Sequence, residues 1–191
     1  MKKIVIGFIM SLLAVLAHAD NVIIEGARTD GLNGGKDSNG VLMKYGKTLN
    51  KNLEVDFQYQ TIQTDVINAM STRLEVGLFP NYDVGFGRVY VRAVYGQKYN
   101  TTPNFAYTSV EPGIIIPLGS GVSTRFGYRY RDAVDSVKFA DRTVTFRAGV
   151  KYDFTKTDAV NLRFDRVRGD QAQNILALSY IKSCLLYTSD A

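Results

Sequence analysis

A strict alternation of apolar and charged residues runs through the segment 122–131, and it constrains the fold more than any other feature. The segment is Val-Ser-Thr-Arg-Phe-Gly-Tyr-Arg-Tyr-Arg, so Arg125, Arg129 and Arg131 share one parity and the aromatic residues share the other. A period of two predicts a β-strand with one apolar face and one charged face. In a water-soluble sheet the charged face would point to solvent, whereas in a barrel set in lipid it would point inward.

The start of the chain bears on this choice, because residues 1–19 are typical of a secretory signal peptide. Met1-Lys2-Lys3 is positively charged, residues 4–16 form an uncharged apolar run, and Ala17-His18-Ala19 is a small-x-small cleavage site. The apolar run is short for a membrane-spanning helix, and no second apolar stretch of about 18 residues follows it. We therefore expect an exported mature protein that begins at Asp20 and has no transmembrane helix.

Composition excludes several classes of function. Loss of Lys2 and Lys3 with the signal peptide lowers the formal net charge from +5 to +3, which is too small to indicate nucleic-acid binding. The single histidine, His18, is lost as well, and Cys184 is the single cysteine. We therefore expect no internal disulfide, no metal site of the Cys/His type and no cofactor.

Residues 184–191 break the pattern that precedes them. Their sequence, Cys-Leu-Leu-Tyr-Thr-Ser-Asp-Ala, resembles the translation of a sequencing-library adapter that replaces the true C-terminus. A short polar tail is the alternative interpretation. The fold prediction therefore uses residues 20–183, which we expect to form a single domain.

Residues 20–183 contain ten segments with strand character and none with a sustained helical period. Most are about 9–14 residues long, which exceeds the usual strand of soluble sheets and suits the roughly 9–11 residues that a tilted strand needs to cross a bilayer. The segments are 21–29, 39–49, 52–62, 69–79, 84–97, 105–118, 121–133, 141–154, 158–168 and 172–183.

The connections between these segments differ in length in a regular way. Tight turns are expected at 50–51, 119–120 and 155–157, and longer polar loops at 30–38 and 98–104. When the chain is followed from the periplasm, the tight turns all fall on the side of both chain ends. This asymmetry is typical of outer-membrane barrels.

Aromatic residues near the strand ends also favour a barrel set in a membrane. Five of them are predicted to form belts at the two membrane interfaces, where amphipathic rings are favoured. They are Tyr59, Tyr95, Tyr130, Phe154 and Tyr180. Phe79 is one step off the apolar parity of its strand and is left out of the belts.

Together, the signal peptide, the strand parity and the loop asymmetry resemble the small outer-membrane β-barrel superfamily of Gram-negative bacteria, with no motif specific to one member. The resemblance implies an all-β fold, a single antiparallel up-and-down transmembrane β-barrel of about ten strands, with eight as the alternative. It also implies short periplasmic turns, modest extracellular loops and a location in the bacterial outer membrane. The implied partners are outer-membrane lipid and lipopolysaccharide, the outer-membrane assembly machinery and small solutes.

Charged residues on the inward parity predict a filled lumen, because barrels of about eight strands leave room only for side chains. Opposite charges in so narrow a space are expected to pair, since an unpaired buried charge costs several kcal/mol. The predicted basic wall is Arg88, Arg92, Arg125, Arg129, Arg131, Arg147, Lys151 and Arg163, and the predicted acidic partners are Glu25, Glu54, Asp56, Glu75, Glu111, Asp153 and Asp165. Lys44 and Arg73 lie on the same inward parity.

Two functions follow from this interior and stay open: a structural barrel with an ion-paired lumen, and a narrow porin-like passive pore biased toward anions. A surface barrel that binds lipopolysaccharide and a soluble periplasmic binding module are the alternatives. The short loops offer little contact area beside the roughly 800 Å² per partner of a standard interface. Enzymes among the barrels that this chain resembles use a histidine, which the mature chain lacks, so we expect no catalytic residue.

Overall fold

The computed structural model describes residues 20–32, 35–65, 70–99 and 104–184. The predicted signal peptide and the tail beyond Cys184 lie outside these ranges. Within them, no helix is long and apolar enough to span a bilayer.

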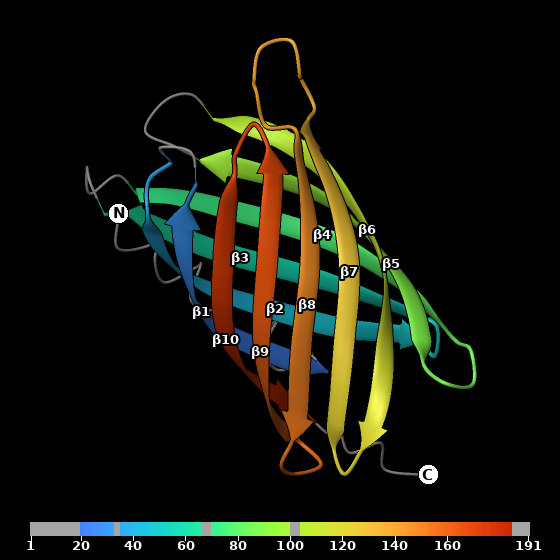
Figure 1. The fold of residues 1–191 in the computed structure, drawn as a ribbon. Helices are drawn as coiled ribbons and strands as arrows, with labels where there is room; N and C mark the ends of the chain where they lie inside the picture. Colours follow the sequence, from blue (N-terminus) through green and yellow to red (C-terminus); the bar gives the residue numbers. More distant parts are fainter. Residues whose placement is uncertain (1–19, 33–34, 66–69, 100–103, 185–191) are drawn as a thin grey trace, which may run out of the picture.

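The described residues form ten antiparallel strands that close into one barrel (Figure 1). Each strand pairs with its neighbours in sequence, and β1 completes the ring by pairing with β10 from Asn21↔Ser183 to Gly31↔Gln173. The ten-stranded up-and-down topology predicted from the alternation is confirmed. The strands are β1 (Asn21–Gly31), β2 (Ser38–Asn50), β3 (Leu53–Thr64), β4 (Met70–Asp83), β5 (Arg88–Tyr99), β6 (Phe105–Gly119), β7 (Val122–Ala133), β8 (Thr143–Asp153), β9 (Asp158–Gly169) and β10 (Gln173–Ser183).

The two faces of the wall have the polarity of a membrane barrel. On β5, Arg92 is 4% exposed while Tyr95 is 57% exposed, and the same alternation repeats around the ring. Glu111 in the interior is 1% exposed, whereas Leu178 on the outer wall is 61% exposed. A soluble barrel with an aliphatic core does not fit this arrangement, because its apolar residues would be inside.

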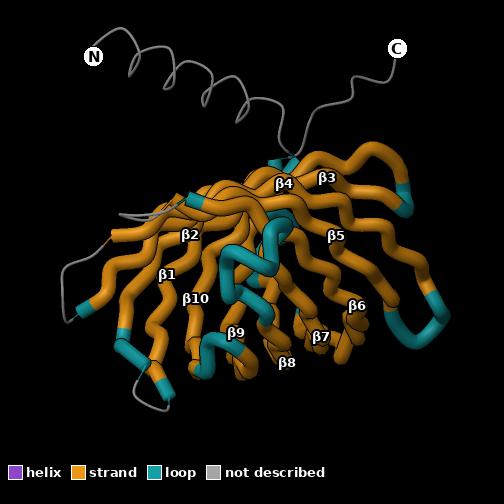
Figure 2. Tube along the Cα trace, turned by 90° about the horizontal axis from the view of Figure 1, so that it is seen from above, coloured by secondary structure: helices purple, strands orange, loops and turns teal. Residues whose placement is uncertain are grey.

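The connections at one end of the barrel are turns of two to four residues, and those at the other end are longer except for the one between β9 and β10. The turns at 51–52, 84–87, 120–121 and 154–157 lie at the end that holds both Asp20 and Cys184, and the Cys184 amide donates a hydrogen bond to the Asp20 carbonyl at 2.8 Å. The β1–β2, β3–β4, β5–β6, β7–β8 and β9–β10 connections leave from and return to strand ends at the other end of the barrel. The β7–β8 loop rises highest in Figure 1, and Figure 2 shows the strands arranged as a ring around the lumen.

The largest differences from the predicted strand boundaries lie at the β4–β5 turn, where the prediction ended one strand at residue 79 and began the next at 84. In the structure β4 continues through Pro80 to Asp83, and the turn is 84–87. Gly85 has a φ of 83°, the Val84 amide donates to the Gly87 carbonyl at 2.8 Å, and Arg88 pairs with Asp83 across the turn at 2.9 Å. The prediction also began a strand at 141, but β8 begins at Thr143 and Asp141 belongs to the loop.

The aromatic residues proposed for the interfaces are all exposed, four of them on strands and Phe154 in the β8–β9 turn. Exposure ranges from 36% for Tyr59 to 57% for Tyr95, with Tyr130, Phe154 and Tyr180 between them. Phe79, the residue off the outward parity, is 7% exposed and stacks on the inward Tyr90 ring at a centroid distance of 4.8 Å.

Candidate functional site

Every strand contributes at least one inward polar side chain to a pair of hydrogen-bonded clusters in the lumen. The two clusters together are called the ion-pair layer. The Arg92 cluster comprises Lys44, Asp56, Glu75, Arg92, Tyr107 and Arg129. The Glu111 cluster comprises Glu25, Tyr90, Glu111, Arg125, Arg147, Arg163, Asp165 and Ser179.

Arg92 is the centre of its cluster because its guanidinium contacts two carboxylates. Its Nε donates to Asp56 Oδ2 at 2.9 Å and its Nη2 to Asp56 Oδ1 at 2.6 Å, a bidentate pair. The same Nη2 lies 3.3 Å from Glu75 Oε2. Lys44 approaches the other side of Asp56 at 3.2 Å. Four adjacent strands, β2 to β5, are thereby joined on their inner face.

Glu75 extends this cluster across the lumen. Its Oε1 accepts hydrogen bonds from the Tyr107 hydroxyl at 2.8 Å and from Arg129 Nη2 at 3.1 Å. Arg129 also donates from Nε to the Ser109 hydroxyl at 3.1 Å. Because Arg129 is on β7 and Glu75 is on β4, this contact bridges strands that are not neighbours in the sheet.

Glu111 holds the second cluster together. Its Oε1 accepts from the Tyr90 hydroxyl at 3.0 Å and from Arg125 Nη2 at 2.9 Å, and its Oε2 accepts from Arg147 Nη1 at 2.7 Å. Arg147 in turn forms a bidentate pair with Asp165 at 2.9 and 3.0 Å. Charged donors thus replace water around each of these buried carboxylates, which offsets the cost of burying them.

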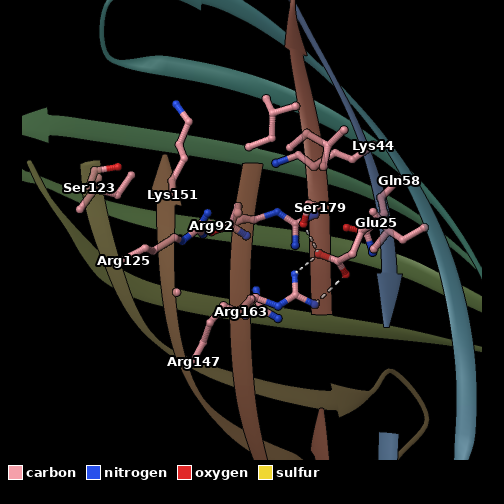
Figure 3. Close-up of a pocket in the computed structure, with 16 residues that line it drawn as sticks. Glu25, Lys44, Gln58, Arg92, Ser123, Arg125, Arg147, Lys151, Arg163 and Ser179 are labelled. Atoms are coloured by element: carbon pink, nitrogen blue, oxygen red, sulfur yellow. Dashed lines mark hydrogen bonds and ion pairs between the residues drawn. The ribbon is translucent and has the colours of Figure 1, made fainter. Parts of the chain in front are cut away.

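The cluster continues across the closure of the ring. Arg163 on β9 forks onto Glu25 on β1 with two hydrogen bonds of 2.8 Å, and the Ser179 hydroxyl on β10 donates to Glu25 at 2.9 Å (Figure 3). Arg163 Nε also lies 3.2 Å from Asp165. The first and last strands are therefore joined by side chains as well as by their backbone ladder.

The remaining predicted residues lie toward the two ends of the barrel. Arg88 pairs with Asp83 at the periplasmic rim, where its side chain is 49% exposed. Lys151 pairs with Asp153 at 2.7 Å near the same rim, and Glu54 lies 3.9 Å from Lys44. Arg131 lies at the extracellular end and is bound there by Asp141 at 2.8 Å.

Two cavities lie on either side of the ion-pair layer. The inner cavity, about 170 Å³, reaches the periplasmic strand ends at Ile23, Ser123 and Lys151. The outer cavity, about 70 Å³, lies toward the extracellular ends of the strands, and its lining includes Arg73 and Arg131. The residues that line both cavities are Leu42, Gln58, Arg92, Arg147 and Arg163. Three arginines of the layer therefore separate the two spaces.

Sequence reasoning missed three contributors to the lumen. Tyr90 and Tyr107 lie on the inward parity of β5 and β6, but only the structure shows their hydroxyls bound to Glu111 and Glu75. Asp141 was assigned to a strand and received no role, because nothing in the pattern indicates that a loop folds back onto Arg131. Among the described residues, no three acidic, histidine or cysteine side chains gather as a metal site would need.

The closed ring, the apolar exterior and the charged lumen define the class: the fold is that of the small outer-membrane β-barrels of Gram-negative bacteria. The predicted location in the bacterial outer membrane agrees with this fold. Charged side chains are buried inside the barrel, and large apolar side chains are exposed on its outside.

Comparison with solved structures gives the same fold. The NanC porin matches with a TM-score of 0.53 and 9% identity over 86% of this chain and 100% of its own. An outer membrane channel from Pseudomonas putida F1 matches with a TM-score of 0.53 and 11% identity over 86% of this chain and 94% of its own. No protein-family model matches the chain, and no curated protein matches it. At these identities the likeness concerns the fold, which these two neighbours use as a porin and a channel.

Proposed function

We propose that this protein is a structural barrel of the outer membrane whose lumen is closed at mid-height by the ion-pair layer. The observation that carries the proposal is that all ten strands contribute to the layer while its acidic groups are almost fully buried. Their exposed fractions do not exceed 2% for Glu25, Asp56, Glu75, Glu111 and Asp165. Side chains that fill a lumen in this way stabilise the barrel and leave little room for a solute.

The proposal also concerns the partners of the barrel. The exposed apolar wall contacts lipid acyl chains, and lipopolysaccharide and the outer-membrane assembly machinery are the further partners that such a wall implies. No catalytic role is proposed, because the carboxylates of the layer are bound by guanidinium groups and are not free to act as bases toward the hydroxyls beside them.

Ion conductance of the refolded full chain in planar bilayers tests the closed lumen. The informative variant is Glu25→Ser combined with Arg163→Ser, because it removes both members of one pair and leaves Asp165 bound to Arg147. Arg163 lines both cavities, so its loss joins them. We expect no steady current through the wild type and a measurable current through the double variant.

The matched control is Asp83→Ser combined with Arg88→Ser, which removes an ion pair at the exposed rim. This control is expected to stay as silent as the wild type. A steady wild-type current that the Glu25/Arg163 variant leaves unchanged would overturn the closed lumen. So would a double variant that folds but stays silent, because the layer would then not be the barrier.

A second candidate function is a narrow passive pore for small anions. It is favoured by the three guanidinium groups of Arg92, Arg147 and Arg163, which face both cavities and would meet any ion that passes between them. The same recordings decide this question. A wild-type current whose reversal potential shows preference for chloride over potassium would replace the structural function with this one.

A further inference from the structure

Two cations oppose each other on the inner wall above the ion-pair layer. Arg73 on β4 is the direct cross-strand partner of Lys98 on β5, and both lie on the inward parity. Like charges directly opposite each other are destabilising in a sheet. Within the described ranges, no carboxylate forms an ion pair with either residue, and the adjoining loop segments 66–69 and 100–103 contain no acidic residue.

A third cation lies close to this pair. Arg131 on β7 is 6% exposed and lies within electrostatic range of both Arg73 and Lys98. Its one carboxylate partner, Asp141, is shared with the side-chain amide of Gln171, and the other Asp141 oxygen has no hydrogen-bond partner. The extracellular end of the lumen therefore holds three cations around one carboxylate.

The polar atoms of these cations are not all satisfied. The Nε atoms of Arg73 and Arg131 are buried and have no hydrogen-bond partner among the described residues. A buried guanidinium donor without an acceptor costs free energy. Arg163 Nε in the ion-pair layer also lacks a hydrogen-bond partner, but Arg163 is ion-paired with Glu25 and Asp165, whereas Arg73 has no carboxylate partner among the described residues.

The outer cavity offers the space for that counter-ion. Arg73, Arg129 and Arg131 line it together with the polar side chains of Gln60, Thr143 and Thr145. Asp165 also lines it, but this carboxylate is bound by Arg147 and Arg163. Lys98 is not part of the lining and lies next to it as the cross-strand partner of Arg73. Its volume of about 70 Å³ corresponds to on the order of five water positions, which suits one small oxyanion and excludes an oligomeric one. We propose that the outer cavity is a binding site for a small inorganic oxyanion, held by the forked donors of Arg73 and Arg131 beside Lys98.

The inner cavity shows why this site is specific to the extracellular end. Its cations are paired: Lys44 with Asp56, Arg125 with Glu111, and Lys151 with Asp153. A counter-ion is not needed there. The proposed site requires no passage through the ion-pair layer, so it goes beyond the proposed function and stands whether or not the lumen conducts.

Calorimetric titration of the refolded full chain in detergent micelles, free of lipid phosphate, tests the site with inorganic phosphate and with sulfate at constant ionic strength. We expect saturable binding of one anion per chain. Arg73→Gln should weaken it about tenfold or more, the loss expected when a charge-assisted contact is removed. Lys151→Gln is the matched control, because it removes a cation that lines the inner cavity, and it should leave the affinity unchanged. The absence of saturable binding, or equal weakening in both variants, would overturn the site.

A melting measurement separates an anion site from a purely structural role of Arg73. In an anion-free buffer Arg73→Gln should melt at the wild-type temperature or above it, because the substitution relieves repulsion from Lys98. Added phosphate should raise the melting temperature of the wild type and not that of the variant. If Arg73→Gln melts lower in the absence of anion and phosphate shifts both proteins equally, Arg73 is structural and the proposal is wrong. Lys98→Gln provides the same comparison should Arg73→Gln not refold.

Discussion

Glu111 shows at the scale of one residue how charge is stabilised inside this barrel. Its side chain is 1% exposed, yet its two oxygens accept hydrogen bonds from two arginines and a tyrosine. Moving a carboxylate out of water costs several kcal/mol unless such partners replace the water. The pairs of the layer are therefore interdependent, and loss of one member leaves the other exposed to that cost.

The first prediction concerns Arg92, whose removal leaves Asp56 with Lys44 alone and takes one cation from Glu75. Arg92→Met keeps the side-chain volume and removes the charge. We expect a loss of about 3–5 kcal/mol in the free energy of unfolding, the cost of breaking a buried pair. Urea unfolding of the barrel in lipid vesicles measures it.

Arg88→Met is the control for this substitution, since its ion pair with Asp83 lies at the exposed rim. Exposed pairs contribute about 0–1 kcal/mol. Equal losses of unfolding free energy in the two variants would show that the buried Arg92 pairs stabilise the barrel no more than an exposed pair does.

The second prediction concerns Gly96, where close approach of an aromatic ring excludes a side chain. A Cβ atom at this position would lie 2.4 Å from Tyr107 Cζ and 2.7 Å from its hydroxyl oxygen. Gly96→Ala is expected to cost about 1–3 kcal/mol, typical of overpacking, and to disturb the Tyr107–Glu75 hydrogen bond. The same unfolding assay measures the loss.

Gly26→Ala is its counterpart on the outer wall of β1, where a Cβ atom would meet nothing within 4 Å. It is expected to leave the stability unchanged or to raise it slightly. A Gly96→Ala barrel as stable as Gly26→Ala would mean that Tyr107 moves aside at no cost.

The direction of each inward side chain could be predicted from the sequence, but its partner could not. A period of two places Glu25, Glu75 and Arg163 on one face whatever the register. Pairing depends on how strands meet across the lumen, and the Glu25–Arg163 contact joins residues 138 positions apart. At the inward Gly96 and Gly113, the space that a side chain would occupy is taken by Tyr107 and Tyr90. Parity alone does not tell which large neighbour fills a gap.

At the scale of elements, strands were predictable and their ends were less so. The alternation survives to the last residues of most strands, but β4 continues past Pro80 to Asp83, beyond the predicted end at residue 79. Pro80 is tolerated because it faces outward near the end of the ladder, where the pairing of β4 with β5 skips from Leu78 to Asn81. The β7–β8 loop was the least predictable element, since its contact through Asp141 is tertiary.

The third prediction tests this loop. Asp141→Asn removes the carboxylate that binds Arg131 and Gln171, so the loop should detach from the barrel mouth. Trypsin cleavage after Lys138 or Arg142 is expected to become several-fold faster while the barrel itself stays intact. Limited proteolysis followed by mass spectrometry measures the rate at each bond.

Asp83→Asn is the control, because it removes one negative charge from a different exposed end. It should leave cleavage in the β7–β8 loop at the wild-type rate. If Asp141→Asn cleaves no faster than this control, the loop is held by contacts other than the ion pair.

At the scale of the whole molecule, the barrel presents an apolar surface outward and keeps its charges inside. A fourth prediction uses this orientation. Leu178 lies at the middle of β10 on the outer wall, between Gly26 and Leu162 of the adjoining strands. Leu178→Arg should destabilise the barrel in vesicles by about 2–4 kcal/mol, the cost of a cationic side chain at the bilayer midplane.

The cost of an arginine on the outer wall depends on its depth in the bilayer, so a substitution near a strand end supplies the comparison. Leu49, also on the exposed wall, lies at the periplasmic end of β2, and Leu49→Arg should cost only about 0–1 kcal/mol. Equal costs at the two depths would contradict a bilayer around the middle of the strands.

The contact between β1 and β10 has a consequence for biogenesis. Glu25, Ser179 and Arg163 come together only when the first and last strands meet, so an unclosed sheet leaves their polar groups uncompensated at its margins. Passage of such a sheet into hydrocarbon is strongly disfavoured. Insertion and ring closure are therefore expected to proceed as one concerted event, completed when the final strand pairs with the first.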